Sequence, residues 1–280
     1  MKDLEGKVAV ITGGASGIGR AVASKAAASG MKVVLADIEE GALEKTVHEM
    51  SGSGADVEPV VTDVSDGAAV ERLRDRALER FGAVHLVHNN AGVGVSGLLW
   101  DFPESDWKWI LGANLWSVIH GIRTFVPMLI EQNEGHVVNT ASLAGLTSPT
   151  CLGPYNATKH AVVTLSETLY RDLQLTGAGV GVSVLCPGFV RTGIAESERN
   201  RPAWAPAGPD DPMSTMGREV ARELVSKGID PEVVGDRVID AVENDTFYIL
   251  THEDAKPMIE ARMHDILDGR SPAAFPPNLG

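Results

Sequence analysis

Short apolar runs rich in valine and isoleucine alternate with amphipathic stretches along most of the 280-residue chain. Apolar runs of about four to eight residues are typical of buried strands, and an apolar period of about 3.6 residues is typical of helices. Strands that alternate with helices form right-handed crossover units, in which the strands run parallel and both sheet faces are covered. We therefore expect a single doubly wound α/β domain, built on a seven-stranded parallel sheet with helices on both faces.

The same pattern gives the expected boundaries of these elements. The strands are expected at residues 8–12, 32–36, 57–62, 86–88, 136–140, 181–185 and 246–250. The helices are expected at residues 17–29, 40–50, 67–81, 104–130, 155–173 and 231–244, with a further one near 255–267.

Two parts of the chain depart from this alternation. Residues 188–228 are rich in proline, glycine and charged residues. Connections this long inside a compact domain are often lids or binding loops, so we expect a substrate loop here. Residues 253–280 follow the expected sheet and comprise a C-terminal helix and a proline-rich tail, which either packs on a neighbouring subunit or frays. The main domain is thus expected over residues 1–252.

The bulk composition excludes several classes of function. The formal charge of −14 argues against a nucleic-acid partner, because phosphate binding requires a basic face. Cys151 and Cys186 provide neither a disulfide framework nor a metal-ligand cluster, so no metal site is expected. The sequence shows no signal-peptide core and no apolar run of membrane-spanning length. We expect a cytoplasmic protein without a membrane partner.

A glycine-rich turn follows the first expected strand, with the sequence Thr12-Gly13-Gly14-Ala15-Ser16-Gly17-Ile18-Gly19. The glycines allow backbone N–H groups to approach a pyrophosphate closely, and the N-terminus of the next helix adds its positive dipole end. The turn lies between a strand and a helix, as dinucleotide binding requires. The residues expected to bind the dinucleotide here are Gly13, Ser16, Gly17, Ile18 and Gly19.

Asp37 ends the second expected strand, about twenty residues beyond the glycines. A carboxylate there accepts hydrogen bonds from the adenosine ribose hydroxyls and repels a 2′-phosphate. Neither Ile38 nor Ser16 is a lysine or arginine, although a 2′-phosphate would need a cation at these positions. The sequence therefore predicts NAD rather than NADP. The alternative for Asp37 is a turn residue ahead of the next helix.

Polar residues also end the third and fourth expected strands. Asp63 and the N–H of Val64 are placed to hold the adenine edge, although a carboxylate at a strand end also commonly caps a helix. Asn89-Asn90-Ala91-Gly92 follows the fourth strand, where small residues let a cofactor approach the backbone and asparagines can tie adjacent strands together. We expect Asn90, Ala91 and Gly92 to contact the cofactor.

Tyr155 and Lys159 lie one helical turn apart, and Ser142 precedes the tyrosine by thirteen positions. Residues i and i+4 share a helix face, so the ammonium group is expected near the phenol. A nearby positive charge favours the phenolate and lowers the pKa of tyrosine from its ordinary value of about 10. With Ser142 holding a substrate oxygen, the three side chains predict a proton-transfer site for an alcohol or carbonyl group.

These motifs, in this order, resemble the short-chain dehydrogenase/reductase family over nearly the whole chain, up to about Leu250. The matching positions are the glycine turn, Asp63, the Asn-Asn-Ala-Gly segment, Asn114, Ser142, Tyr155-x-x-x-Lys159 and Pro187-Gly188. The resemblance implies a Rossmann-type fold and a nicotinamide cofactor. It also implies a catalytic set of Asn114, Ser142, Tyr155 and Lys159.

The resemblance further implies a role for each member of this set. Tyr155 is the general base in oxidation and the acid in reduction, and Ser142 orients the substrate oxygen. Lys159 lowers the pKa of the tyrosine and holds the nicotinamide ribose. Asn114 distorts its helix and binds a water that links Lys159 to solvent. The residues expected to face the nicotinamide carboxamide are Pro187, Gly188, Val190 and Thr192.

The expected substrate pocket is mostly apolar, which suits a medium-sized apolar alcohol or ketone, aromatic or alicyclic. Residues 193–202 and 248–250 are similar to bacterial dehydrogenases that act on aryl-substituted secondary alcohols. Trp204 either lines the pocket or packs its loop onto the domain. Arg191, Arg199 and Arg201 either meet a substrate carboxylate or form a solvated face. The residues expected in the pocket wall are Val93, Val95, Ser142, Leu143, Leu152, Tyr155, Phe189 and Trp204.

Trp109 and Trp116 are seven positions apart in the expected helix 104–130 and should share one face. That face either packs in the core or forms a subunit interface. The family resemblance implies dimers and tetramers paired through the fourth and fifth long helices. We therefore expect a homo-oligomer, with a tetramer favoured over a dimer.

The expected function is hydride transfer between NAD(H) and a secondary alcohol or ketone as small-molecule substrate. One alternative is an NADP-linked ketoreductase, and another is a non-catalytic dinucleotide sensor that regulates partners. The complete set of Asn114, Ser142, Tyr155 and Lys159 argues against a sensor, which has no need of a tuned phenol.

Overall fold

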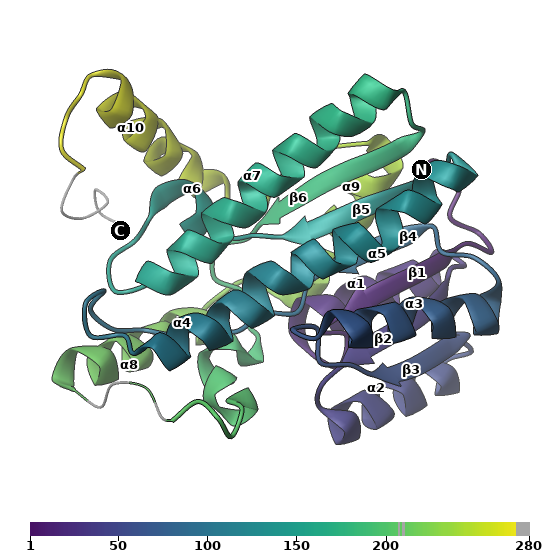
Figure 1. Ribbon diagram of the computed structural model, residues 1–280, viewed down its shortest axis with the longest axis horizontal. Helices are drawn as coiled ribbons and strands as arrows, with labels where there is room; N and C mark the ends of the chain where they lie inside the picture. Colours follow the sequence, from purple (N-terminus) through teal and green to yellow (C-terminus); the bar gives the residue numbers. More distant parts are fainter. Residues whose placement is uncertain (207, 209–210, 273–280) are drawn as a thin grey trace.

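One sheet of seven parallel strands organises the chain, with the order β3-β2-β1-β4-β5-β6-β7 (Figure 1). The computed structural model describes residues 1–206, 208 and 211–272. The end of the expected tail, 273–280, lies outside the described residues, as do 207 and 209–210 of the expected substrate loop. The strands are β1 (Val8–Thr12), β2 (Lys32–Asp37), β3 (Val57–Val61), β4 (Leu86–Asn89), β5 (Gly135–Thr140), β6 (Val180–Cys186) and β7 (Tyr248–Leu250).

The sheet order reverses at β1, which pairs with β2 on one side and with β4 on the other. In the register of these strands, Ala9 lies opposite both Val33 and Leu86. At such a switch point the helices leave to opposite faces of the sheet and open a crevice at the carboxyl ends of the strands. The fold therefore places a ligand crevice next to the glycine turn.

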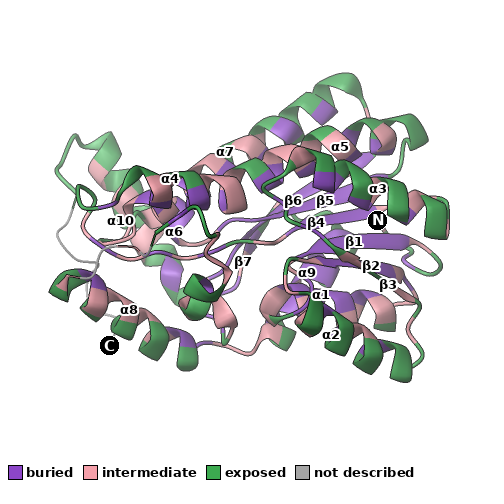
Figure 2. Ribbon diagram, turned by 60° about the horizontal axis from the view of Figure 1, so that its bottom comes forward, coloured by how far each residue is buried: buried purple, intermediate pink, exposed green. Residues whose placement is uncertain are grey.

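Helices cover both faces of the sheet, which confirms the expected doubly wound α/β fold. One face carries α1 (Gly17–Ala28), α2 (Glu40–Gly52) and α9 (Pro231–Asn244), and the other carries α3 (Gly67–Phe81), α5 (Ser117–Gln132) and α7 (Gly153–Thr176). Apolar side chains of the strands and of the inner helix faces form the two core layers. Figure 2 shows the buried strands between helices whose outer faces are exposed.

The expected helix 104–130 is interrupted. It consists of α4 (Glu104–Leu111), a π-helical turn η1 (Gly112–Trp116) and α5. A π turn inserts an extra residue and shifts the phase of the helix. The expectation that Trp109 and Trp116 share a face is therefore wrong: the side chain of Trp109 is 6% exposed, whereas Trp116 is 48% exposed.

Several elements were not predicted. Within residues 188–228 the chain forms the 3-10 segment η2 (Gly193–Asn200) and the helix α8 (Pro212–Ser226), and α6 (Ala144–Thr147) follows β5. The start of α8 carries a clear sequence signal, since Asp211 caps it by accepting from two backbone N–H groups and Pro212 is its first residue. At the C-terminal side, η3 (Glu253–Ala255) leads into α10 (Lys256–Leu267), which is the helix expected near 255–267. None of the helices in the described part of the chain is long and apolar enough to cross a bilayer.

Candidate active site

A cavity of about 590 Å³ opens at the carboxyl ends of the strands. The segments that follow β1 to β6 line it, as the switch point requires. Every residue expected to bind cofactor or substrate, or to move a proton, lies in its wall apart from Gly19 and Asn114. Gly19 packs directly behind the wall, where an added Cβ would lie 2.2 Å from the carbonyl oxygen of Gly13.

The glycine turn packs tightly against its neighbours in this wall. Gly13 has φ +62°, and a Cβ there would lie 2.9 Å from Ala91 Cα. Gly17 has φ +52°, and a Cβ there would lie 2.9 Å from Thr192 Cγ2. Only glycine fits such positions without strain. Because the glycines carry no side chain, a pyrophosphate can approach the backbone N–H groups at the N-terminus of α1 closely. This part of the wall is here called the glycine cradle.

Asp37 is fixed at the edge of this cradle. Its Oδ2 accepts a hydrogen bond from the N–H of Ala15 and its Oδ1 accepts one from the N–H of Glu39, both at 3.0 Å. The carboxylate therefore serves as a turn residue, and each oxygen keeps capacity for a second donor such as a ribose hydroxyl. Asp63 is held similarly, since its Oδ1 accepts from both the N–H and the hydroxyl of Ser65.

Tyr155 and Lys159 lie on the first turns of α7, facing the cavity. The ammonium of Lys159 lies 5.5 Å from the centre of the Tyr155 ring and donates to the carbonyl oxygen of Thr140 at 2.8 Å. Burial lowers the pKa of Lys159 to about 8, because the charged form loses its hydration. Burial raises the pKa of Tyr155, and the hydrogen bond with Ser142 lowers it by less. The pKa of Tyr155 is therefore raised in this structure, opposite to the lowering expected from the sequence, because burial of the phenol outweighs the hydrogen bond with Ser142.

Asn114 occupies the π turn, which turns its amide toward the segment after β4. Its Oδ1 accepts from the N–H of Val93 at 2.7 Å, and its Nδ2 donates to the carbonyl oxygen of Val93 at 2.9 Å. The side chain is 1% exposed. Asn114 thus lies in the distorted turn of its helix, and its amide fixes Val93 of the cavity wall.

Asparagines tie adjacent strands together below the cavity. Asn89 Nδ2 donates to Asn139 Oδ1 across β4 and β5 at 2.8 Å. Asn90 Nδ2 donates to the carbonyl oxygen of Thr12 at 3.0 Å, and Thr12 Oγ1 accepts from the N–H groups of Asn90 and Ala91. These bonds hold the turns after β1 and β4 in one rigid unit.

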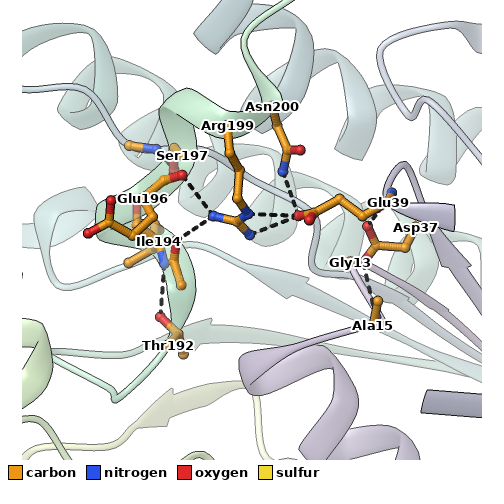
Figure 3. A network of polar contacts seen from close by, with 12 residues as sticks. Gly13, Ala15, Asp37, Glu39, Thr192, Ile194, Glu196, Ser197, Arg199 and Asn200 are labelled. Carbon is orange, nitrogen blue, oxygen red and sulfur yellow. Dashed lines mark hydrogen bonds and ion pairs between the residues drawn. The ribbon is translucent and has the colours of Figure 1, made fainter. Parts of the chain in front are cut away.

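The tripeptide Arg199-Asn200-Arg201, here called the strap, joins the two walls of the cavity. Arg199 Nε and Asn200 Nδ2 each donate to Glu39 Oε1 at 2.9 Å on the side of the glycine turn (Figure 3). Arg201 Nη1 donates to Asp106 Oδ1 of α4 at 2.6 Å on the opposite side. The strap therefore fastens the segment after β6 to both the β2 and the α4 walls.

Arg191, Arg199 and Arg201 all form hydrogen bonds within the protein. For Arg201, neither contact with a substrate carboxylate nor a place on a solvated face holds. Its side chain is 8% exposed, and its guanidinium carbon lies 4.3 Å over the Trp109 ring. Arg191 donates to Asp230 and to the carbonyl oxygen of Gly228. Glu39 and Asp106 were missed as site residues, because their partners lie 160 and 95 positions away and no local pattern connects them.

The expected substrate residues form an apolar wall. Val93 and Val95 are buried in one cluster with Phe102 and Trp109, and Tyr155 packs against it. Trp204 lines the cavity while 59% of its side chain is exposed, so it lies at the rim. Among the described residues no group of histidine, cysteine and acidic side chains is arranged to hold a metal ion.

The sheet order, the glycine cradle and the Ser142-Tyr155-Lys159 cluster define an oxidoreductase of the Rossmann type. The family model described as short chain dehydrogenase matches residues 7–203, and the chain belongs to the short-chain dehydrogenase/reductase family. A CLA biosynthesis dehydrogenase/reductase of Lactiplantibacillus plantarum is 37% identical over 97% of both chains. A 1-deoxy-11-beta-hydroxypentalenate dehydrogenase of Streptomyces avermitilis is 36% identical over 94% of this chain and 91% of its own. The crystal structure of a Burkholderia phymatum short-chain dehydrogenase/reductase in complex with NAD is 48% identical and superposes with a TM-score of 0.97, with both chains fully covered.

Proposed function

We propose that the protein is an NAD-dependent dehydrogenase that interconverts a secondary alcohol and a ketone. The observation that carries this proposal is the meeting of the Tyr155 phenol, the Ser142 hydroxyl and the Lys159 ammonium in the wall of the cavity that the glycine turn also lines. The similar Burkholderia protein was crystallised with NAD, which supports the choice of cofactor.

The residues of the chain supply the proton chemistry. The cofactor would be held by the glycine turn and by the segment of Pro187, Gly188, Val190 and Thr192, and it would supply a hydride acceptor as NAD⁺ and a hydride donor as NADH. Ser142 holds the substrate oxygen, and Tyr155 takes its proton in oxidation and returns it in reduction. Protonated Lys159 favours the phenolate of Tyr155 and opposes the effect of burial. Asn114 acts by positioning Val93 beside the reacting group.

The apolar wall supports a medium-sized aromatic or alicyclic substrate. The name of the Streptomyces relative, a dehydrogenase of a hydroxypentalenate, is consistent with an alicyclic alcohol. Residues 188–228 are proposed to form the substrate loop of the domain at 1–252, since the strap joins this loop to both cavity walls. Cys151 and Cys186 are free thiols, which fits a cytoplasmic location.

A panel of secondary alcohols tests the proposal through formation of the reduced cofactor. We expect aryl and alicyclic secondary alcohols to exceed short hydroxy acids in kcat/KM. With the best substrate, kcat/KM for NAD⁺ should exceed kcat/KM for NADP⁺ by about tenfold or more, because the carboxylates of Asp37 and Glu39 both repel a 2′-phosphate. Comparable values with the two cofactors would favour the NADP-linked ketoreductase. Binding of NAD⁺ with no turnover of any panel member would leave the dinucleotide sensor as the better description.

Exposed apolar side chains on η1, α5 and α7 support a homo-oligomer. Trp116 at the end of η1, Ile130 on α5, and Tyr170 and Leu175 on α7 are all exposed. Large apolar side chains left exposed on helices are consistent with a subunit interface. We expect light scattering at micromolar concentration to give a multiple of the 29.6 kDa chain mass, with a tetramer favoured. A monomer mass would contradict this expectation.

A further inference from the structure

A cation that is distant in the sequence lies beside Asp37, at the end of the cavity where the adenosine ribose is expected. The side chain of Arg199 extends from η2 to Glu39, which lies two residues beyond Asp37. Its Nε and Nη2 are both 2.9 Å from Glu39 Oε1 (Figure 3). Both residues line the cavity together with Asp37. A guanidinium at this place is the group that a 2′-phosphate would seek, because arginine binds phosphate through paired N–H donors.

Other groups already occupy the donors of this guanidinium. Nη1 of Arg199 donates to the carbonyl oxygens of Gly193 and Glu196, both at 2.8 Å, while Nε and Nη2 serve Glu39. Asn200 adds a third donor to the same Glu39 oxygen. Burial raises the pKa of Glu39, but the hydrogen bonds from Asn200 and Arg199 outweigh it and hold the pKa below its usual range. Glu39 is therefore ionised at neutral pH and neutralises Arg199.

We propose that Glu39 is a second determinant of cofactor choice, which withholds Arg199 from a 2′-phosphate. A bound 2′-phosphate would meet the carboxylates of Asp37 and Glu39 and would have to displace Arg199 from its partner. Without the Glu39 charge, Arg199 turns from a neutralised strap residue into a phosphate receptor. The inference rests on the proposed function, because it requires the adenosine ribose to lie beside Asp37.

Calorimetric titration of the intact protein with NAD⁺ and NADP⁺ tests this inference without any substrate. We expect Glu39→Gln to lower the Kd for NADP⁺ by about tenfold or more, since it frees a charged donor for the phosphate. The double variant Glu39→Gln/Arg199→Gln should lose this gain. Glu196→Gln is the matched control. Glu196 is an exposed carboxylate in the same segment as Arg199, but its side chain pairs with Arg222 at 2.8 Å. It should bind NADP⁺ as the unmodified protein does.

Arg199→Gln alone provides an independent measurement. It leaves Glu39 without its guanidinium partner, so NADP⁺ should bind more weakly than to the unmodified protein. An equal gain for NADP⁺ in Glu39→Gln and in the double variant would overturn the inference. Equal losses of affinity for NAD⁺ and NADP⁺ in these variants would also overturn it, because the pair of Glu39 and Arg199 would then only hold the loop in place. Failure of the unmodified protein to bind NAD⁺ would instead refute the cofactor placement on which the inference rests.

Discussion

Replacing Tyr155 by phenylalanine is expected to lower kcat by about a thousandfold or more, because general acid–base catalysis commonly contributes a factor of about 10² to 10⁴. The substitution removes only the hydroxyl that shares a hydrogen bond with Ser142. The ring still packs against the apolar wall, so the cavity keeps its shape. The Kd for NADH should therefore change by less than about threefold, which corresponds to under 1 kcal/mol.

Tyr248→Phe is the matched control for this substitution. Tyr248 lies on β7, its hydroxyl donates to Glu167 at 2.5 Å, and it lies outside the cavity wall. The control should retain the turnover of the unmodified protein. Turnover by Tyr155→Phe close to that of Tyr248→Phe would refute the assignment of Tyr155 as the acid and base.

Replacing Arg201 by methionine is expected to cost about 3 kcal/mol of unfolding free energy, since removal of one partner leaves an uncompensated buried charge. Asp106 is 1% exposed, and its Oδ1 accepts from Arg201. Its Oδ2 has no hydrogen-bond partner among the described residues, so the substitution would leave the whole carboxylate unpaired. Methionine can still pack on the Trp109 ring. The substitution removes the pairing with Asp106, the exposed pairing with Glu198 and a hydrogen bond to the carbonyl oxygen of Pro206, and the buried Asp106 carries most of the expected cost. Urea unfolding at pH 7 provides the measurement.

Arg222→Met removes a comparable ion pair from the surface. Arg222 pairs with Glu196 at 2.8 Å, and both side chains are more than half exposed. Exposed pairs contribute at most about 1 kcal/mol, so this control should unfold close to the unmodified protein. Equal losses of unfolding free energy in the two variants would show that the buried pair of Arg201 and Asp106 stabilises the fold no more than an exposed pair.

The sheet and the glycine cradle could be predicted because local patterns determine them. Runs of valine and isoleucine between glycine turns indicated all seven strands, although the last one begins at Tyr248 rather than at 246. The Gly13 and Gly17 positions followed from the turn itself, since only glycine allows the backbone to approach so closely. The spacing of Tyr155 and Lys159 likewise placed both side chains on one helix face.

The remaining features depend on tertiary contacts that no local pattern encodes. The π turn at η1 leaves Trp109 buried and Trp116 exposed, and within this turn the amide of Asn114 bonds to Val93. The pairing of Arg199 with Glu39 joins segments that become neighbours only when the sheet has formed. For this reason the residues next to Asp37 and in the glycine turn, Ile38 and Ser16, indicated no cation, although the fold brings Arg199 to this place.

Transfer of deuterium from a carbinol-deuterated secondary alcohol to NAD⁺ tests hydride transfer at this site most directly. The predicted result with the unmodified protein is a ketone together with a reduced nicotinamide that carries the label. Tyr155→Phe should form neither product at a measurable rate. A reduced cofactor without deuterium, or equal label transfer by Tyr155→Phe, would contradict the proposed dehydrogenase.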